Sequence, residues 1–337
     1  MHMSSTNLEK LNLNWLFDNS RLKKSVIRNL LENHEVPKYV FGYSPMAAES
    51  AKNFILNKSF PSYSNQILHK EQTLLSREVS FIRQRLDLVS KINIFDVSET
   101  SGNSSLPFIF ELLEHDMMGK YTPVTPNQEV NQIAIDTLKK LVKEVLLPDF
   151  ETESILADAE ISSFKSLVMD TVDKTIPTND YINLFLLTGS RLGNSHEPQK
   201  MLQNIYDSMN EGDCLAILQG LYRSGSEDTI VSDYSSIVSS NDVLMSQKMV
   251  GKSINPEAKF EVFWDDQDIP GVVFGVKSSS AKNLLDADLK ENQNITLMRS
   301  SRFREMMLRD IILKSGFHIV DIAYDKNMDH GMFFLEK

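Results

Sequence analysis

Residues 181–194 read YINLFLLTGSRLGN, a nearly continuous apolar run that ends in a polar turn. The run itself, residues 181–188, lacks the alternation of a half-buried strand and is typical of a parallel strand buried on both faces of a sheet. Parallel strands are usually joined by helices, and ligands bind beyond their carboxyl ends. The stretch therefore predicts an α/β fold with a candidate binding site just after residue 188.

Strands and helices alternate on both sides of this run. KINIFDV, residues 91–97, is a short apolar strand that leads through the turn SETSGNSS into the helical stretch PFIFELLE. Such alternation predicts a doubly wound, Rossmann-like sheet. The other predicted strands are residues 120–124, a short strand around Asp158, and residues 214–220, with predicted helices at 128–146 and 198–210.

A second, smaller α+β unit is predicted outside this core. Residues 1–35 have the periodicity of helices, and between residues 224 and 302 the strand–helix alternation stops. Three stretches there read as strands of an inserted antiparallel or mixed sheet, at 259–264, 271–277 and 295–298. A helix at 303–315, ended by Gly316, and two strands at 317–324 and 331–335 return to the core. We expect a core of residues 64–224 plus 303–337 and a second unit of residues 1–63 plus 225–302.

The composition is that of an ordinary globular protein, with 41% hydrophobic and 24% charged residues among 337. A net charge of −11 opposes binding to phosphate backbones, so no nucleic-acid partner is expected. The only basic cluster has helical spacing and is expected to be a solvated helix face. It consists of Arg299, Arg302, Arg304, Arg309 and Lys314.

Membrane, disulfide and metal chemistry are not expected. No apolar run is long enough to span a bilayer, and the opening MHMSSTNLEK lacks the apolar region of a secretion signal, so we expect a cytoplasmic protein without a membrane partner. The single cysteine, Cys214, lies in the apolar run CLAIL and is expected to be a buried structural thiol. The histidines lack metal-ligand spacing, so no metal is predicted.

Three predicted strands end in polar loops: DVSETSG at 96–102, ADAE at 157–160 and TGSRLGN at 188–194. Such loops offer backbone N–H groups, helix N-termini and short polar side chains. Because the carboxyl ends of parallel strands share one edge of the sheet, these loops together suit a cofactor that carries a carboxylate and hydroxyl groups.

The fragment LFLLTGSRLGN, followed by EPQKMLQNIYDSMNEGDCLAIL, resembles the histidine-specific Nα-methyltransferase family of the ergothioneine pathway. In that family a strand ends in a GSxxGN-like turn, before a helix and a strand that opens with GD. The resemblance, which makes this chain a divergent member, implies a class I methyltransferase core that binds S-adenosylmethionine and shares an amino-acid pocket with the second unit. The matching residues are Gly189, Ser190, Gly193, Asn194, Gly212 and Asp213, and the order of elements extends the match from about Tyr39 to the end.

By this resemblance, residues at the strand ends hold the methyl donor. Asp96 keeps the family's acidic residue, but Ser98 and Thr100 replace two glycines that permit close approach of the cofactor. Thr125 stands where a carboxylate usually binds the ribose hydroxyls, and it can bind them only without charge assistance. The expected cofactor-binding residues are Asp96, Ser98, Thr100, Gly102, Thr125, Asp158, Ala159, Thr188, Gly189 and Ser190.

The resemblance also implies acceptor-binding residues: Tyr39, Tyr63, Asn194, Met298 and Ser300. Asn194 would hold the amino and carboxylate groups of the substrate, or else only cap the next helix. The two tyrosines would line the pocket, or else form a buried wall without function. Met298 stands where the family has a carboxylate that reads an imidazole, unless it is ordinary packing. Histidine is therefore not the expected substrate, and a less polar amino acid or another amine is.

The leading hypothesis is an enzyme that transfers a methyl or other alkyl group from S-adenosylmethionine to the amine of an amino acid or related small molecule. Such a displacement depends on alignment and on an unprotonated amine, and no general base or other catalytic residue is assigned. The alternative is a non-catalytic relative that binds an amino-acid-like ligand or a partner protein. A nicotinamide-dependent oxidoreductase ranks below both, because no GxGxxG follows a predicted strand.

Overall fold

The structure is a computed structural model of the whole chain. The residues that it describes are 20–37, 39–43, 47–48, 62–85, 91–98, 104–171, 181–239, 250, 259–266, 269–278 and 293–337.

The main sheet has the strand order β10-β11-β6-β5-β1-β2-β3, and β4 pairs with β2. Six strands pair in parallel: β3, β2, β1, β5 and β6 lie side by side in that order, which is the order of a doubly wound sheet, and β4 pairs with β2. The doubly wound sheet that the sequence predicts is confirmed. Strand β11, which lies between β6 and β10, runs antiparallel to both of them. The strands are β1 (Lys91–Asp96), β2 (Met118–Thr125), β3 (Glu151–Thr152), β4 (Ile155–Leu156), β5 (Tyr181–Leu187), β6 (Cys214–Gly220), β10 (His318–Tyr324) and β11 (His330–Glu336).

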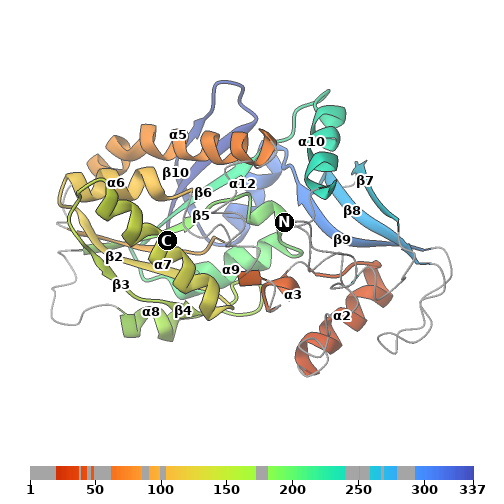
Figure 1. Cartoon of the computed structure of the whole chain (residues 1–337), viewed down its shortest axis with the longest axis horizontal. Coiled ribbons are helices and arrows are strands. Elements are labelled where there is room, and N and C mark those ends of the chain that lie inside the picture. Colours follow the sequence, from red (N-terminus) through yellow and green to blue (C-terminus); the bar gives the residue numbers. More distant parts are fainter. Residues whose placement is uncertain are drawn as a thin grey trace.

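Helices cover both faces of this sheet, and Figure 1 shows α5 and α6 lying along one of them. The first face carries α5 (Ser62–Arg85), α6 (Leu106–Glu114) and α7 (Gln128–Glu144), and the second carries α8 (Lys165–Thr171), α9 (Pro198–Ser208) and α12 (Glu305–Lys314). Strand β5 serves both layers, because Leu184 and Leu186 join the first core cluster while Phe185 and Leu187 join the second. The expected burial of this strand on both faces is confirmed.

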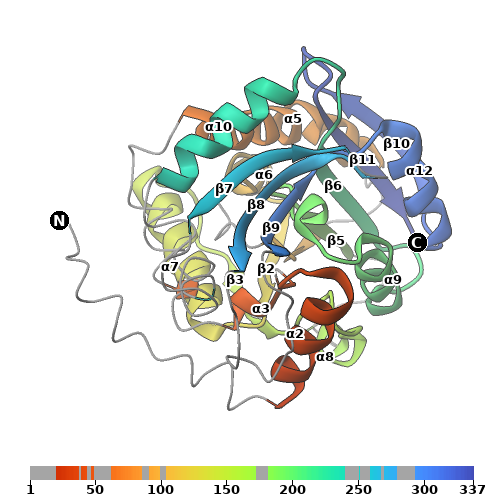
Figure 2. The ribbon, with the colours of Figure 1, turned by 90° about the vertical axis from the view of Figure 1, so that its right-hand side faces the viewer.

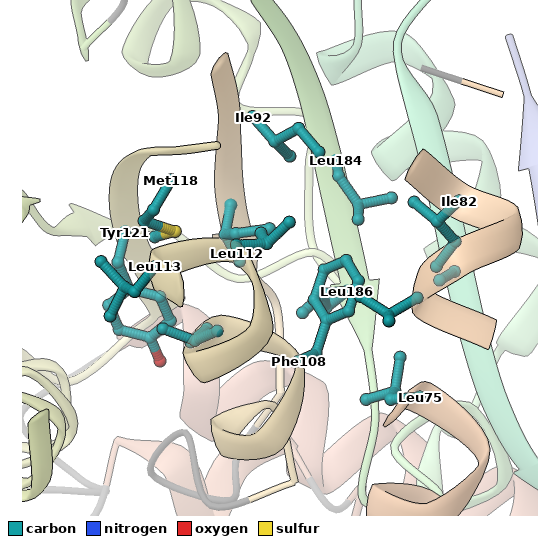
Figure 3. Close-up of a cluster of buried hydrophobic side chains, with 14 of the residues drawn as sticks. Leu75, Ile82, Ile92, Phe108, Leu112, Leu113, Met118, Tyr121, Leu184 and Leu186 are labelled. Atoms are coloured by element: carbon teal, nitrogen blue, oxygen red, sulfur yellow. The ribbon is translucent and has the colours of Figure 1, made fainter. Parts of the chain in front are cut away.

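The core under α5 and α6 is built from fully buried side chains. Figure 3 shows Phe108 of α6 and Leu75 of α5 gathered around Leu184 and Leu186 of β5. Full burial of a side chain of this size contributes roughly 1.5–3 kcal/mol relative to exposure. The packing fixes the height of α5 on the sheet, which matters for the site because one residue of this helix reaches the loop after β5.

Local signals set where several elements begin and end. The side-chain oxygen of Asn127 caps α7 by accepting from the backbone N–H groups of Glu129 and Val130. Pro198 opens α9, where its missing N–H leaves no hydrogen bond unmade. Gly316, with a φ of 93°, follows the end of α12 and lets the chain turn back into β10.

A separate three-stranded antiparallel sheet, β7-β8-β9, lies beside α10 (Glu227–Ser239), as Figure 2 shows. Its strands are β7 (Phe260–Asp265), β8 (Gly271–Ser278) and β9 (Gln293–Ser301). The segment after α2 (Ser20–Asn33) pairs with β9: Val36 N donates to Thr296 O, and Thr296 N donates to His34 O, both at 2.9 Å. The N-terminal segment and the insertion therefore lie together, while their role as a distinct substrate-binding unit stays a prediction.

The expected solvated helix face of basic residues is wrong. Arg299 lies on strand β9 and pairs with Asp265 at 2.7 Å, and Arg302 is only 2% exposed. Only Arg309 and Lys314 lie on the helix, where each pairs with an acid one turn earlier. The strand extends to Ser301, beyond the expected end at residue 298, and this carries the first two arginines out of the helix. Cys214, by contrast, is buried as expected.

None of the helices in the described part of the chain combines the length and the apolar character that crossing a bilayer requires.

Candidate functional site

The site is built where the chain order of the main sheet reverses. Strands β1 and β5 are neighbours, and the chain leaves β1 toward β2 on one side and β5 toward β6 on the other. Ligands of doubly wound sheets bind beyond the carboxyl ends of the strands at such a point. Here the two ends carry the segment from Asp96 to Ser98 and the segment from Thr188 to Asn194.

Asp96, the last residue of β1, has a buried carboxyl group with hydrogen bonds to both of its oxygens. Its Oδ1 accepts from Ser98 N at 3.1 Å, and its Oδ2 accepts from Ser105 Oγ at 3.0 Å and Tyr121 Oη at 2.9 Å. Burial raises the pKa of Asp96, and these hydrogen bonds act in the opposite direction. Asp96 thus ties Ser98, Ser105 and Tyr121 together at the end of β1.

Ser98 joins the two loops of the site. Its Oγ lies 2.8 Å from Thr188 Oγ1 and accepts from Thr188 N at 3.0 Å. A glycine at position 98 would lack this hydroxyl, so the departure from the family pattern gives the chain a direct link between the ends of β1 and β5. Thr100 and Gly102 lie outside the described residues.

Glu71 is a site residue that the sequence analysis misses. This side chain of α5 is fully buried; its Oε2 accepts from Gly189 N at 2.9 Å and Ser104 Oγ at 2.8 Å, and its Oε1 accepts from Ser190 N at 3.1 Å. Burial raises the pKa of Glu71 to about 7, against the opposing effects of these hydrogen bonds and of Arg302. The signal in the sequence was an acid on a helix face that also carries Leu74 and Leu75.

Asn194 ends the short 3₁₀ helix η2 (Leu192–Asn194) that follows β5. Its backbone N donates to Ser190 O at 3.1 Å, so the turn at Gly189–Ser190 sets its position. The half-buried side chain makes no hydrogen bond within the described part of the chain. It does not cap α9, whose N-cap residue is Glu197. Among the expected substrate contacts, Asn194 is thus the side chain whose amide is available to a ligand.

A buried ion pair lies under the end of this turn. Glu160 Oε1 is 2.6 Å from Arg191 Nη1, and Glu160 Oε2 accepts from Ser195 Oγ at 3.1 Å and His196 N at 3.2 Å. The His196 ring in turn lies 3.6 Å from a carboxylate oxygen of Glu35, in the segment after α2, and this acid raises the pKa of His196. Removal of one partner of a buried pair is strongly destabilising, so the pair fixes the turn against the loop before α8.

The other residues that the sequence predicts to bind the cofactor lie at neighbouring strand ends and make hydrogen bonds within the chain. Thr125 Oγ1, at the end of β2, bonds to the backbone of Asn127, which begins the cap of α7. Asp158 Oδ1 accepts from Glu160 N at 3.0 Å, and Ala159 O accepts from Asn204 Nδ2 at 2.7 Å. These three residues form the loops on the β2 side of the switch point.

Strand β9 carries Met298 and Ser300, which the sequence predicts to bind the substrate, and its end lies against the turn after β5. Gln219 at the end of β6 accepts from Gly193 N at 2.9 Å and donates to Ser301 O at 3.2 Å, so the end of β9 docks on the turn that holds Asn194. Ser300 is buried with its Oγ 2.5 Å from Tyr234 Oη, and Met298 is 7% exposed opposite Phe274. The side chains of Tyr39, in α3 (Tyr39–Gly42), and of Tyr63, in α5, lie outside the described part.

Comparisons with known proteins give partial structural likenesses only. No model of a protein family matches the chain, and no curated protein matches it. One similar solved structure is an S-adenosylmethionine-dependent methyltransferase from Clostridium acetobutylicum, with 10% identity and a TM-score of 0.38 over 79% of this chain and 91% of that one.

Two further solved structures are similar at the same level. A 1,6-didemethyltoxoflavin-N1-methyltransferase from Burkholderia thailandensis has 9% identity and a TM-score of 0.42, over 87% of this chain and 90% of that one. A putative Zn-dependent alcohol dehydrogenase from Rhodobacter sphaeroides has 10% identity and a TM-score of 0.44, over 87% and 99%. Likenesses this distant assign neither a ligand nor an activity to the chain.

Proposed function

We propose that this chain transfers a methyl group from S-adenosylmethionine to the amine of a small molecule, an amino acid or related compound other than histidine. The observation that carries the proposal is the switch point itself. An acid at the end of β1, Asp96, organises the loop after it, and the open amide of Asn194 lies on the loop after β5. The sheet around them has the doubly wound strand order that the sequence predicts, with one antiparallel strand, β11, inserted beside β6.

The charge of the site favours a cationic donor over a dinucleotide. Two buried carboxyl groups, Asp96 and Glu71, bond to the loops on either side of the switch point. In dinucleotide-binding folds the pyrophosphate lies against a glycine-rich GxGxxG turn after the first strand, whereas the sequence after β1 here is Val97-Ser98-Glu99-Thr100-Ser101-Gly102. S-adenosylmethionine brings a positively charged sulfur with a transferable methyl group, and a neighbouring carboxylate stabilises such a charge. The buried acids therefore favour this donor, and the missing glycine motif after β1 opposes a nicotinamide cofactor.

The residues of the site would position the methyl donor and the amine. The Ser98–Thr188 link holds the two loops of the site together, and Asn194 offers a carbonyl oxygen and an amide group with which to orient an amine. Orientation is the main requirement of a one-step displacement, because well-placed reactants gain most of their advantage from alignment. Met298 and Ser300, on the strand that docks beside Asn194, would set which amine is accepted.

A turnover assay tests the proposal. Purified chain is incubated with S-adenosylmethionine carrying a deuterated methyl group and a pool of free amino acids and small amines, and products are found by their mass. Transfer of the labelled methyl group to one of these amines is the expected result. If no label is transferred and S-adenosylhomocysteine is not formed, the enzymatic assignment is lost, and binding of an amino acid by the inactive chain would favour the non-catalytic alternative.

A further inference from the structure

Glu71 stands out among the buried ionisable groups because it belongs to no loop of the site, yet bonds to two of them. It lies on α5, 118 residues from Gly189 in sequence, and is completely buried. One carboxyl group therefore ties three segments together: helix α5, the turn before α6 at Ser104, and the turn after β5 at Gly189 and Ser190.

The turn that Glu71 holds is in an unfavourable backbone conformation. Gly189 and Ser190 both have positive φ values, 69° and 53°, and Ser190 is one of few non-glycine residues with such an angle among those described. The left-handed region is disfavoured for residues with a Cβ. Such a conformation persists only when its surroundings over-determine it. Consecutive N–H groups in a turn of this kind point into a common concavity that binds an anion, and here the anion is the Glu71 carboxylate.

The geometry of this turn reaches the proposed site directly. Asn194 N donates to Ser190 O at 3.1 Å, so a change at Ser190 moves the start of η2 and the Asn194 side chain with it. Arg302 Nη1 lies 3.5 Å from Ser190 Oγ, and Arg302 is the residue that follows β9. Both the core side and the insertion side of the site therefore depend on where this turn lies.

Protonation of Glu71 would change these contacts. The ionised carboxylate accepts three hydrogen bonds, but the neutral acid carries a proton on one oxygen and cannot face every donor as an acceptor. Burial raises the pKa of Glu71 to about 7. Arg302, at the end of β9, is the charged group that favours ionisation. Lys70, the residue before Glu71, pairs with Asp329 and Asp325 of the β10–β11 hairpin, and His330 of β11 is kept neutral near pH 7 because burial lowers its pKa.

We propose that Glu71 is a positioning residue: its carboxylate holds the Gly189–Ser190 turn, and through it Asn194, in the arrangement that binds ligand, and loss of its charge releases them. Unlike the proposed function, the claim about the turn does not depend on which ligand binds; only its second measurement, on ligand affinity, rests on that function.

The first measurement follows backbone amide signals by NMR between pH 5.5 and 8.5. The amide signals of Gly189, Ser190 and Asn194 of the wild-type chain should shift together with one midpoint near 7. In Glu71→Gln this shared titration should disappear, while Glu78→Gln, a change on the same helix whose acid pairs only locally with Arg77, should keep it. Signals that do not titrate in the wild type, or that still titrate in Glu71→Gln, would overturn the proposal. If Glu71→Gln does not fold, His196→Gln decides: the shared titration should persist in that variant, and its disappearance there would assign it to His196, whose pKa Glu35 raises, and overturn the proposal.

The second measurement is the affinity for S-adenosylhomocysteine at pH 6 and pH 8. The wild type should bind up to about tenfold more tightly at pH 8, which is the ratio of the ionised fractions of a group with a pKa of about 7, and Glu71→Gln should bind weakly at both values. Equal affinity of the wild type at both pH values overturns the link to the site. Shared titration of the amides without any binding of the nucleotide would instead reject the proposed function and leave the role of Glu71 in the turn intact.

Discussion

At the scale of single residues, the site consists of polar groups that mostly satisfy one another. Asp96 accepts three hydrogen bonds, and Ser98 and Thr188 bond to each other. Asn194 is the exception, since its side chain makes no hydrogen bond within the described part of the chain. Substitution of a residue that is hydrogen-bonded within the chain is expected to lower stability. Substitution of Asn194 is expected to lower activity.

Replacement of Asp96 by Asn is expected to destabilise the fold. Asparagine has one acceptor oxygen instead of two, so its amide nitrogen faces either Ser98 N or both Ser105 Oγ and Tyr121 Oη, and a buried donor loses its acceptor at a cost of about 1–3 kcal/mol. Denaturant unfolding measures the loss. Asp136→Asn on α7, where the acid bonds only to an exposed Gln132, serves as control and should change stability by less than about 0.5 kcal/mol. Equal stability of the two variants would contradict the assigned role of Asp96.

Replacement of Asn194 by Ala is expected to leave stability nearly unchanged and to remove turnover. A misplaced acceptor amine can lower the rate about 100-fold, whereas a partly exposed side chain without hydrogen bonds contributes little to folding. Steady-state kinetics on the amine found by the turnover assay, together with thermal unfolding, separate the two effects. Asn204→Ala, which loses the bond to Ala159 O, is the matched control and should show the reverse pattern. A fully active Asn194→Ala would remove this residue from the site.

At the scale of elements, the second sheet reaches the core through the end of β9. A Cβ on Gly193 would lie 2.5 Å from Ser301 O and 2.6 Å from Gln219 Nε2, so the close approach of β9 to η2 requires a glycine. This contact, rather than the length of the insertion, places Ser300 near the turn of Asn194.

Gly193→Ala is expected to lower stability by about 1–3 kcal/mol, because the overpacked contact must separate. Gly212, with a φ of 84° and open space around its Cα, provides the control: Gly212→Ala adds a conformational cost without a collision. The Gly193 variant should also show faster amide hydrogen exchange in β9, and the Gly212 variant should not. Protection of β9 that is equal in the two variants would contradict the docking contact.

Most elements of the main sheet could be predicted from the sequence, because their signals are local, whereas the two-residue strand β3 is too short to give a pattern and is missed. The apolar run of β5, the turn after β1 and the helix cap at Asn127 are signals that lie within a few residues. The prediction of a basic helix face was wrong because the helical spacing of basic residues continues through Arg299 and Arg302. No local signal in the sequence shows that β9 ends only at Ser301. Glu71 could not be found this way, since its partners lie 33, 118 and 119 residues away.

At the scale of the whole molecule, buried acids make stability depend on pH. Burial raises the pKa of Asp213 to about 6 and that of Glu71 to about 7. A folded-state pKa above the unfolded value means that the neutral acid is the form that the fold favours. Its contribution is fully present below the unfolded pKa, near 4, and is lost as pH rises through the folded value. The contribution of these two acids to stability should therefore decrease between about pH 4 and pH 7.

Asp213→Asn tests this sign. Residue 213 stays uncharged in the variant. The unfolding free energy of the wild type should therefore fall by about 1–3 kcal/mol relative to that of the variant as the pH rises from 4 to 7. Denaturant unfolding at several pH values measures it, and Asp207→Asn, an exposed acid of α9, should show no such shift. A wild type that gains stability relative to Asp213→Asn as pH rises would show that the assigned sign is wrong.

Calorimetric titration of the folded wild-type chain with S-adenosylmethionine and S-adenosylhomocysteine, with NAD as comparison, tests whether the switch point between β1 and β5 binds a sulfonium methyl donor. We expect binding of both adenosyl compounds in the micromolar range and none of NAD, because no glycine-rich GxGxxG turn for a pyrophosphate follows β1. Binding of NAD alone, or no heat with any of the three, would contradict the proposed function.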